Sequence, residues 1–232
     1  MNIFHFATRD LGILIYLSQL GGISSEISIS TSEIASCFAI SQQTASRSLL
    51  SLASRGLIEF SSSPRGSKVQ LTAKGENVLH QLRFELERAL HPKLNVLTIK
   101  GTVFSGLGEG KYYVSHRAYM EGFKSKLGFS PFPGTLNLRI DSSYLDRVDI
   151  LRGSWPIIIP GFEDEGRRFG EVLCYPVSIP GLSAQVAIII PRRTHYSVSV
   201  LELISDVYLR EELKLKDGDK LTIEFSLKKD KA

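Results

Sequence analysis

Hydrophobic residues recur at helical spacing through most of the first ninety residues of the chain. This period predicts four helices, at 6–20, 31–38, 42–54 and 73–90. Ser30 or Thr31 is expected to cap the second helix, and Thr72 the fourth. A pair of strands is predicted between the last two helices, at 57–60 and 68–71, with a flexible serine-rich tip at 61–67. In the third helix, the side chains expected to face the core are Ala45, Leu49, Leu50, Leu52 and Ala53.

From Leu97 onward the pattern becomes that of β-strands. Pro92 disfavours helix at the residue before it, which predicts a boundary there and two domains, 1–92 and 97–232. Strands are expected at 97–104, 136–140, 155–159, 169–179, 184–190 and 220–227, and a helix-like segment within 197–213. Six or so short strands with long loops favour a small closed barrel. The predicted fold class is therefore α+β and multidomain, with a helical domain followed by a six-stranded β-barrel.

The bulk composition is that of a soluble globular protein with room for two cores. The 232 residues are 43% hydrophobic and 22% charged, with a net charge of +4. No run of about 18 apolar residues predicts a membrane span, and the N-terminus lacks a secretory pattern, so the cytoplasm is expected. Cys37 and Cys174 fall in different predicted domains, which argues against a disulfide, and the absence of a CxxC pair leaves no zinc signature.

A glycine-rich segment follows the first strand of the second domain, with the sequence SGLGEGKYY from Ser105 to Tyr113. Glycines at alternate positions let the backbone approach a ligand and direct successive N–H groups to one side, which suits a phosphate chain. The segment is not the phosphate loop of the common NTPases, because no Lys-Ser/Thr pair follows the last glycine. Glu109 would repel phosphate unless it turned outward, so it is assigned to the loop only. Lys111 either neutralises phosphate charge or is solvated.

A second distinctive segment is LGFSPFPGTLNL, from Leu127 to Leu138. Alternation along a strand places Thr135 and Asn137 on one face, with Leu136 and Leu138 buried on the other. Two neutral oxygen side chains beside a phosphate cradle can hold Mg²⁺, whose remaining ligands are then phosphate and water.

Together these two segments resemble the archaeal-type CTP-dependent riboflavin kinases, and the resemblance extends from about Leu97 to the end of the chain. It implies a cradle-loop barrel that transfers the γ-phosphate of CTP to the 5′-hydroxyl of riboflavin, giving FMN and CDP. It assigns Mg²⁺ to Thr135 and Asn137. It assigns the nucleotide to Gly106, Leu107, Gly108, Glu109, Gly110, Lys111, Val207, Tyr208, Leu209 and Arg210.

The flavin contacts implied by the same resemblance are a threonine and a glutamate eight positions later, here Thr194 and Glu202. Glu202 is the better candidate for a catalytic residue, because a carboxylate can accept the proton of an attacking hydroxyl and a threonine cannot. The alternative is that Glu202 is a solvated residue of a helix. His195 is expected to be a structural or surface residue.

The order of elements before Pro92 is that of a winged helix-turn-helix domain. Residues 30–60 resemble the DNA-binding portion of the MarR-like regulators. The helix at 42–54 would enter the major groove of double-stranded DNA and the hairpin would meet phosphate or the minor groove, with contacts from Gln42, Gln43, Thr44, Ser46, Arg47, Arg65 and Lys68. Such proteins commonly bind as two-fold pairs, so a homodimer through this domain is one expectation.

The charge of this domain does not favour DNA binding strongly. Residues 1–90 contain eight Lys/Arg and seven Asp/Glu, whereas strong DNA binders show a basic face. DNA binding is weighed against two alternatives, a domain that no longer binds DNA and a role in protein contact, because a fold does not fix a function.

Two hypotheses for the whole chain follow. One is an enzyme that phosphorylates riboflavin, and the other is a flavin- or nucleotide-sensing transcription factor without turnover. The presence of Thr135, Asn137 and Glu202 favours the enzyme.

Overall fold

The computed structural model describes residues 7–63, 66–92, 95–106, 108–164, 166–191 and 199–228. The chain divides into two compact units, Met1–Leu86 and Glu87–Ala232. The division lies within helix α4 (Ala73–Leu90) rather than at Pro92, where the sequence predicts it. Each unit has a buried hydrophobic cluster of its own.

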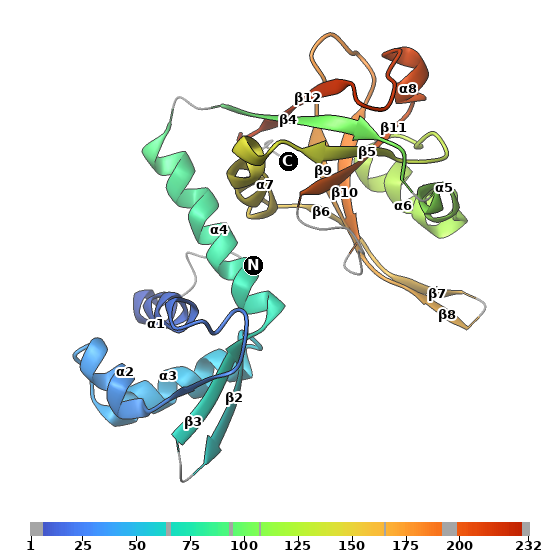
Figure 1. Cartoon of the computed structure of the whole chain (residues 1–232). Coiled ribbons are helices and arrows are strands. Elements are labelled where there is room, and N and C mark those ends of the chain that lie inside the picture. Colours follow the sequence, from blue (N-terminus) through green and yellow to red (C-terminus); the bar gives the residue numbers. More distant parts are fainter. Residues whose placement is uncertain are drawn as a thin grey trace. The chain divides into compact units, whose positions relative to one another are not determined.

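The first unit packs helices against a small antiparallel sheet of order β1-β3-β2 (Figure 1). Its elements are α1 (Thr8–Gln19), β1 (Ile27–Ile29), α2 (Thr31–Cys37), α3 (Gln42–Ser54), β2 (Ile58–Ser63), β3 (Gly66–Leu71) and the first part of α4. Ser30 and Glu33 form a capping box at the start of α2. Thr72 Oγ1 accepts a hydrogen bond from the backbone N–H of Gly75 at the start of α4, so both predicted caps are confirmed.

Two details of this unit differ from the sequence prediction. The expected flexible tip at 61–67 is largely strand, because β2 continues to Ser63 and β3 begins at Gly66. Leu50 was expected to face the core but is 55% exposed, while Leu49 and Leu52 are fully buried. A helix turns by about 100° per residue, so Leu49, Leu50 and Leu52 point in directions too far apart for all three to face one core.

The second unit is built on a seven-stranded antiparallel sheet of order β12-β4-β5-β11-β10-β9-β6 (Figure 1). Its strands are β4 (Val96–Phe104), β5 (Leu136–Ile140), β6 (Ile157–Ile159), β9 (Val172–Val177), β10 (Val186–Pro191), β11 (Val200–Ser205) and β12 (Lys220–Ser226). A separate ribbon pairs β7 (Phe162–Asp164) with β8 (Arg167–Phe169). The helices are α5 (Glu109–Val114), α6 (Arg117–Leu127), α7 (Leu145–Arg152) and α8 (Leu209–Glu212), with a 3₁₀ turn at Ser142–Tyr144.

The structure does not confirm the closed six-stranded barrel that the sequence predicts, because the described strands pair in an open order from β12 to β6. Ser178, just beyond β9, exchanges two backbone hydrogen bonds with Glu224 of β12, at 2.9 and 2.8 Å. One isolated bridge is not a paired ladder, so closure of the sheet is not confirmed. The bridge nevertheless brings β9 and β12 together. The predicted strands at 155–159 and 169–179 are also shorter in the structure, as β6 and β9.

The helix-like segment expected at 197–213 is wrong over most of its described length. Residues 200–205 form strand β11, which pairs with β5 and β10, and only α8 is helical. The spacing of Leu201 and Ile204 suggested a helix, but both are buried within a central strand. A strand that is covered on both faces loses the alternation that would identify it.

Among the described residues, no helix is both long and apolar enough to cross a membrane.

Candidate active site

Three oxygen-bearing side chains come together at the start of β5 and on the neighbouring strand β11. Asn137 and Glu202 are direct partners in the antiparallel ladder, so their side chains lie on the same side of the sheet. Thr135, two residues before Asn137, donates a hydrogen bond from Oγ1 to Glu202 Oε1 at 3.2 Å. The alternative that Glu202 is a solvated helix residue is wrong, because it is a half-buried residue of a strand.

The amide of Asn137 carries an unusual feature for a buried polar group. The residue is only 7% exposed, and among the described residues its Oδ1 has no hydrogen-bond partner. An amide oxygen without a partner costs free energy when it is buried. A hard cation that prefers oxygen ligands would satisfy it, so Thr135 and Asn137 fit the Mg²⁺ that the sequence predicts.

The glycine-rich loop reaches this cluster directly. Gly108 has φ +82°, a left-handed conformation that favours glycine, and α5 begins at the next residue. A Cβ at Gly110 would lie 3.0 Å from Thr135 Cγ2 and closer still to Thr135 Oγ1. No larger residue fits at Gly110 unless Thr135 moves, so the loop and the oxygen cluster are in contact.

Beside the cluster lies a pocket of about 110 Å³. It is lined by two segments, the approach to β5 and the region from β11 to α8, through Phe132, Pro133, Gly134, Thr135, Leu136, Leu203, Ser205, Val207, Tyr208, Leu209 and Arg210. The rings of Phe132 and Tyr208 stack, with centroids 4.9 Å apart, and the backbone N–H of Phe132 donates to Ser205 O at 2.7 Å. The structure therefore brings Thr135 and the segment 207–210 to one cavity.

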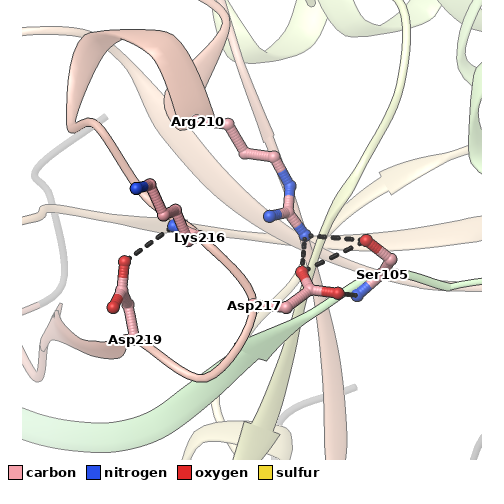
Figure 2. A network of polar contacts seen from close by, with 5 residues as sticks. All are labelled: Ser105, Arg210, Lys216, Asp217 and Asp219. Atoms are coloured by element: carbon pink, nitrogen blue, oxygen red, sulfur yellow. Dashed lines mark hydrogen bonds and ion pairs between the residues drawn. The ribbon is translucent and has the colours of Figure 1, made fainter.

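A polar network connects the same segment to the start of the glycine loop (Figure 2). Asp217 accepts hydrogen bonds from the backbone N–H and the hydroxyl of Ser105, at 3.0 and 3.1 Å. Arg210 Nη2 donates to the same carboxylate at 2.8 Å. The hydrogen bond from Arg210, followed by those from Ser105, holds the pKa of Asp217 below its usual range. Asp217 therefore remains ionised at neutral pH.

Aromatic contacts support α5, the helix that follows the loop. Arg167 of β8 lies over the rings of Tyr112 and Tyr113 and donates to the Tyr113 hydroxyl at 3.0 Å. His116 Nδ1 accepts from the backbone N–H of Ala118, so its Nε2 carries the proton that bonds Asp164 of β7 at 3.0 Å. The ribbon β7–β8 is thus fastened to α5 and α6.

Other predicted site residues are placed less informatively. Lys111 is exposed, and Glu109 is the first residue of α5. Leu107 and Thr194 lie outside the described residues.

Sequence reasoning missed Ser105, Phe132, Ser205 and Asp217. Asp217 was visible only as part of a turn signal, Lys216-Asp217-Gly218-Asp219, because nothing local in that segment indicates that it faces Ser105.

The residues predicted to contact DNA differ in their surroundings. Gln42, Gln43 and Arg47 are exposed on α3, while Thr44 is half-buried and its hydroxyl lies 2.8 Å from that of Ser41, the cap of the helix. Lys68 Nζ lies 2.7 Å from Glu26 Oε1 in an exposed ion pair. Ser46 is half-buried, and Arg65 lies outside the described residues.

Residues 103–225 match the family model named for CTP-dependent riboflavin kinases and described as a domain of unknown function, DUF120. The riboflavin kinase of Archaeoglobus fulgidus is 41% identical over 94% of this chain and 92% of its own length. The riboflavin kinases of Methanospirillum hungatei and Thermoplasma acidophilum are 40% and 42% identical, over 94% and 90% of this chain and 98% and 93% of their own. The chain therefore belongs to the CTP-dependent riboflavin kinase family.

Two solved structures show weaker similarity. A MarR family transcription regulator aligns with a TM-score of 0.32 and 22% identity, over 39% of this chain and 58% of its own. The Staphylococcus aureus MepR–DNA complex aligns with a TM-score of 0.30 and 20% identity, over 39% of this chain and 66% of its own.

Proposed function

We propose that this protein is a CTP-dependent riboflavin kinase, which transfers the γ-phosphoryl group of CTP to the 5′-hydroxyl of riboflavin. The observation that carries the proposal is the convergence of the glycine loop on Thr135, which itself bonds Glu202. A phosphate cradle, two neutral oxygen ligands and a carboxylate are thereby held at one place. Phosphoryl transfer needs these elements together, because its catalysis is mainly positioning and stabilisation of charge.

In this proposal, residues 106–111 hold the phosphate chain and residues 207–210 contact the base in the adjoining pocket. Thr135 and Asn137 would hold Mg²⁺, which supplies charge neutralisation at the β- and γ-phosphate oxygens when bound.

Glu202 accepts the proton of the riboflavin 5′-hydroxyl while the oxygen of that hydroxyl forms its bond to the γ-phosphorus. The bond from the γ-phosphorus to the β–γ bridging oxygen breaks, and CDP leaves with that electron pair. The hydroxyl of Thr135 orients the Glu202 carboxylate for this role.

The test is phosphoryl transfer from γ-labelled CTP to riboflavin in the presence of Mg²⁺, with labelled FMN and unlabelled CDP as expected products. A Glu202→Gln variant, which keeps the shape of the side chain, should still bind both substrates and turn over far more slowly. Binding of flavin or nucleotide by the wild type without any FMN formed would favour the alternative of a ligand-sensing transcription factor.

A second activity, binding of double-stranded DNA, is proposed for the first unit. It is favoured by the exposure of Gln42, Gln43 and Arg47 at the N-terminal half of α3, where a recognition helix contacts base edges. Lys68 would contribute a phosphate contact only after leaving Glu26. A gel-shift titration of the full chain against a randomised duplex pool tests the activity, and light scattering of the same sample tests the expected homodimer.

A further inference from the structure

We infer that Asp217 is a positioning residue of the nucleotide site, which fixes Arg210 against the start of the glycine loop. The inference rests on the proposed function, since it takes residues 106–111 and 207–210 as the two halves of a nucleotide site. It adds a residue that touches neither base nor phosphate in the proposed assignment and acts through Ser105 and Arg210.

The carboxylate of Asp217 connects both halves at once (Figure 2). Its Oδ2 accepts from the backbone N–H of Ser105, the residue before Gly106, at 3.0 Å. Its Oδ1 accepts from the Ser105 hydroxyl at 3.1 Å and from Arg210 Nη2 at 2.8 Å. Arg210 Nη2 also lies 3.5 Å from the Ser105 hydroxyl, which closes the triangle.

The turn that presents Asp217 is itself well anchored. The backbone N–H of Val103 donates to Asp219 O at 2.8 Å, and that of Gly218 donates to Val103 O at 2.9 Å. Within the turn, Asp219 Oδ2 accepts from the backbone N–H of Lys216 at 2.7 Å. Asp217 is therefore held on a turn bonded to the end of β4, next to the strand end from which the glycine loop departs.

Arg210 lines the pocket, and only 22% of its side chain is exposed. A guanidinium has five N–H donors, so the bond to Asp217 leaves others for an anionic or carbonyl ligand. An arginine held in place loses less rotational freedom on binding a ligand than a mobile one. Fixing Arg210 should therefore favour nucleotide binding rather than the chemical step.

The experiment compares Asp217→Asn with Asp219→Asn in the full chain. The first change removes the charge that holds Arg210. The second is a matched control in the same turn, because the Asp219 side chain bonds Lys216 and contacts neither Arg210 nor Ser105 in the network. We expect Asp217→Asn to raise KM for CTP by about 3- to 10-fold, the range for an exposed charge-assisted hydrogen bond. We expect kcat and KM for riboflavin to change less than about 2-fold, because the lost interaction stabilises bound CTP equally in the ground state and the transition state.

Three results would overturn the inference: an unchanged KM for CTP in Asp217→Asn, an equal rise in Asp219→Asn, or a fall confined to kcat. The affinity for CDP, measured by calorimetry, provides a second comparison that does not depend on turnover. If the wild type binds CDP but phosphorylates no riboflavin, the proposed function fails while the CDP affinities of the two variants still decide the role of Asp217. If the wild type binds no cytidine nucleotide, both fail.

Discussion

Asn137 and Glu202 are direct cross-strand partners in the β5–β11 ladder. The pairing places an amide whose buried oxygen has no partner among the described residues beside a carboxylate already bonded by Thr135. The proposed cation ligand and the proposed proton acceptor are thus fixed by the sheet itself rather than by a loop, which suits a reaction that depends on in-line geometry.

Replacing Asn137 by alanine should lower kcat by about 100-fold or more at fixed magnesium, because even indirect support of a metal ligand is worth 10- to 100-fold. Riboflavin affinity, measured from quenching of flavin fluorescence, should change little. Asn137→Asp keeps an oxygen at the same place and should retain more turnover than the alanine variant. Wild-type kcat in Asn137→Ala would show that the metal lies elsewhere.

Gly110→Ala tests the contact between loop and cluster. The added methyl group meets Thr135, so either the loop or the threonine must shift, and a displacement of about 1 Å can cost about 100-fold in rate. Gly170→Ala is the matched control, because a Cβ there meets nothing within 4 Å. Steady-state kinetics and thermal melting of both variants separate a site defect from misfolding. Equal activities in the two variants would show that the contact between Gly110 and Thr135 does not contribute to catalysis.

The sequence predicted those parts of the protein that local patterns determine. The capped helices of the first unit and the strands at 97–104 and 136–140 were found because caps, glycines and alternation mark them. The same alternation predicted that Asn137 lies in the strand 136–140, while its role and that of Thr135 as metal ligands stay predictions. The conformation around Glu202 was not, because β11 is a central strand whose buried residues at 203–205 follow no period of two.

Contacts between distant segments were beyond local patterns. Asp217 follows Ser105 by more than a hundred residues, and nothing near either one specifies the partner. The ribbon β7–β8 and helices α5, α6 and α7 were also missed. Their apolar residues, such as Tyr119 and Phe123, are spaced by four but lie among glycines and prolines that indicate loops.

The two units should be separable. Their buried clusters share no residue, since one runs from Ile13 to Val78 and the other from Val114 to Ile204. A chain beginning at Glu87 should fold and keep turnover within about tenfold of the full chain, given the independent cores.

A chain beginning at His91 lacks Arg88, whose guanidinium lies 5.9 Å from the Trp155 ring, and should be less stable by about 0.5–1 kcal/mol. Urea unfolding of the chains beginning at Glu87 and at His91 measures the difference in their free energy of unfolding. An unfolded 87–232 chain would show that earlier α4 residues belong to the second core.

DNA binding should depend on the exposed residues of α3. Arg47→Ala should cost roughly 1–3 kcal/mol if the guanidinium contacts a base, or lower the slope of log affinity against log salt by about one if it contacts phosphate. Glu26→Gln should strengthen binding, because it frees Lys68 from its ion pair. Lys74→Ala controls for net charge, because it removes an exposed lysine of α4 whose Nζ donates to Arg55 O at 2.7 Å, at the opposite end of α3 from Gln42 and Gln43. Unchanged affinity in an Arg47→Ala, Arg65→Ala, Lys68→Ala triple variant would exclude this interface.

CTP should serve as phosphoryl donor far better than ATP. The chain has no GxxxxGK[ST] loop, and the candidate base pocket of about 110 Å³ is lined in part by Ser205 and residues 207–210. Cytosine offers an amino donor beside ring-nitrogen and carbonyl acceptors, and a purine leaves different polar groups unpaired. Unpaired buried groups give strong discrimination, whereas pocket size alone gives little, so kcat/KM for CTP should exceed that for ATP by about 100-fold or more.

UTP is the matched ligand for this prediction, since its base has the same ring size and a different hydrogen-bonding edge. We expect UTP to be used poorly. A pocket that recognises the hydrogen-bonding edge of cytosine rejects uracil, whereas a pocket that recognises only ring size would accept it. The measurement is kcat/KM for riboflavin phosphorylation with each of the four nucleoside triphosphates at saturating riboflavin. Use of UTP equal to that of CTP would mean that ring size sets the choice. Use of ATP equal to or better than that of CTP would overturn the donor assignment and leave the riboflavin kinase activity standing.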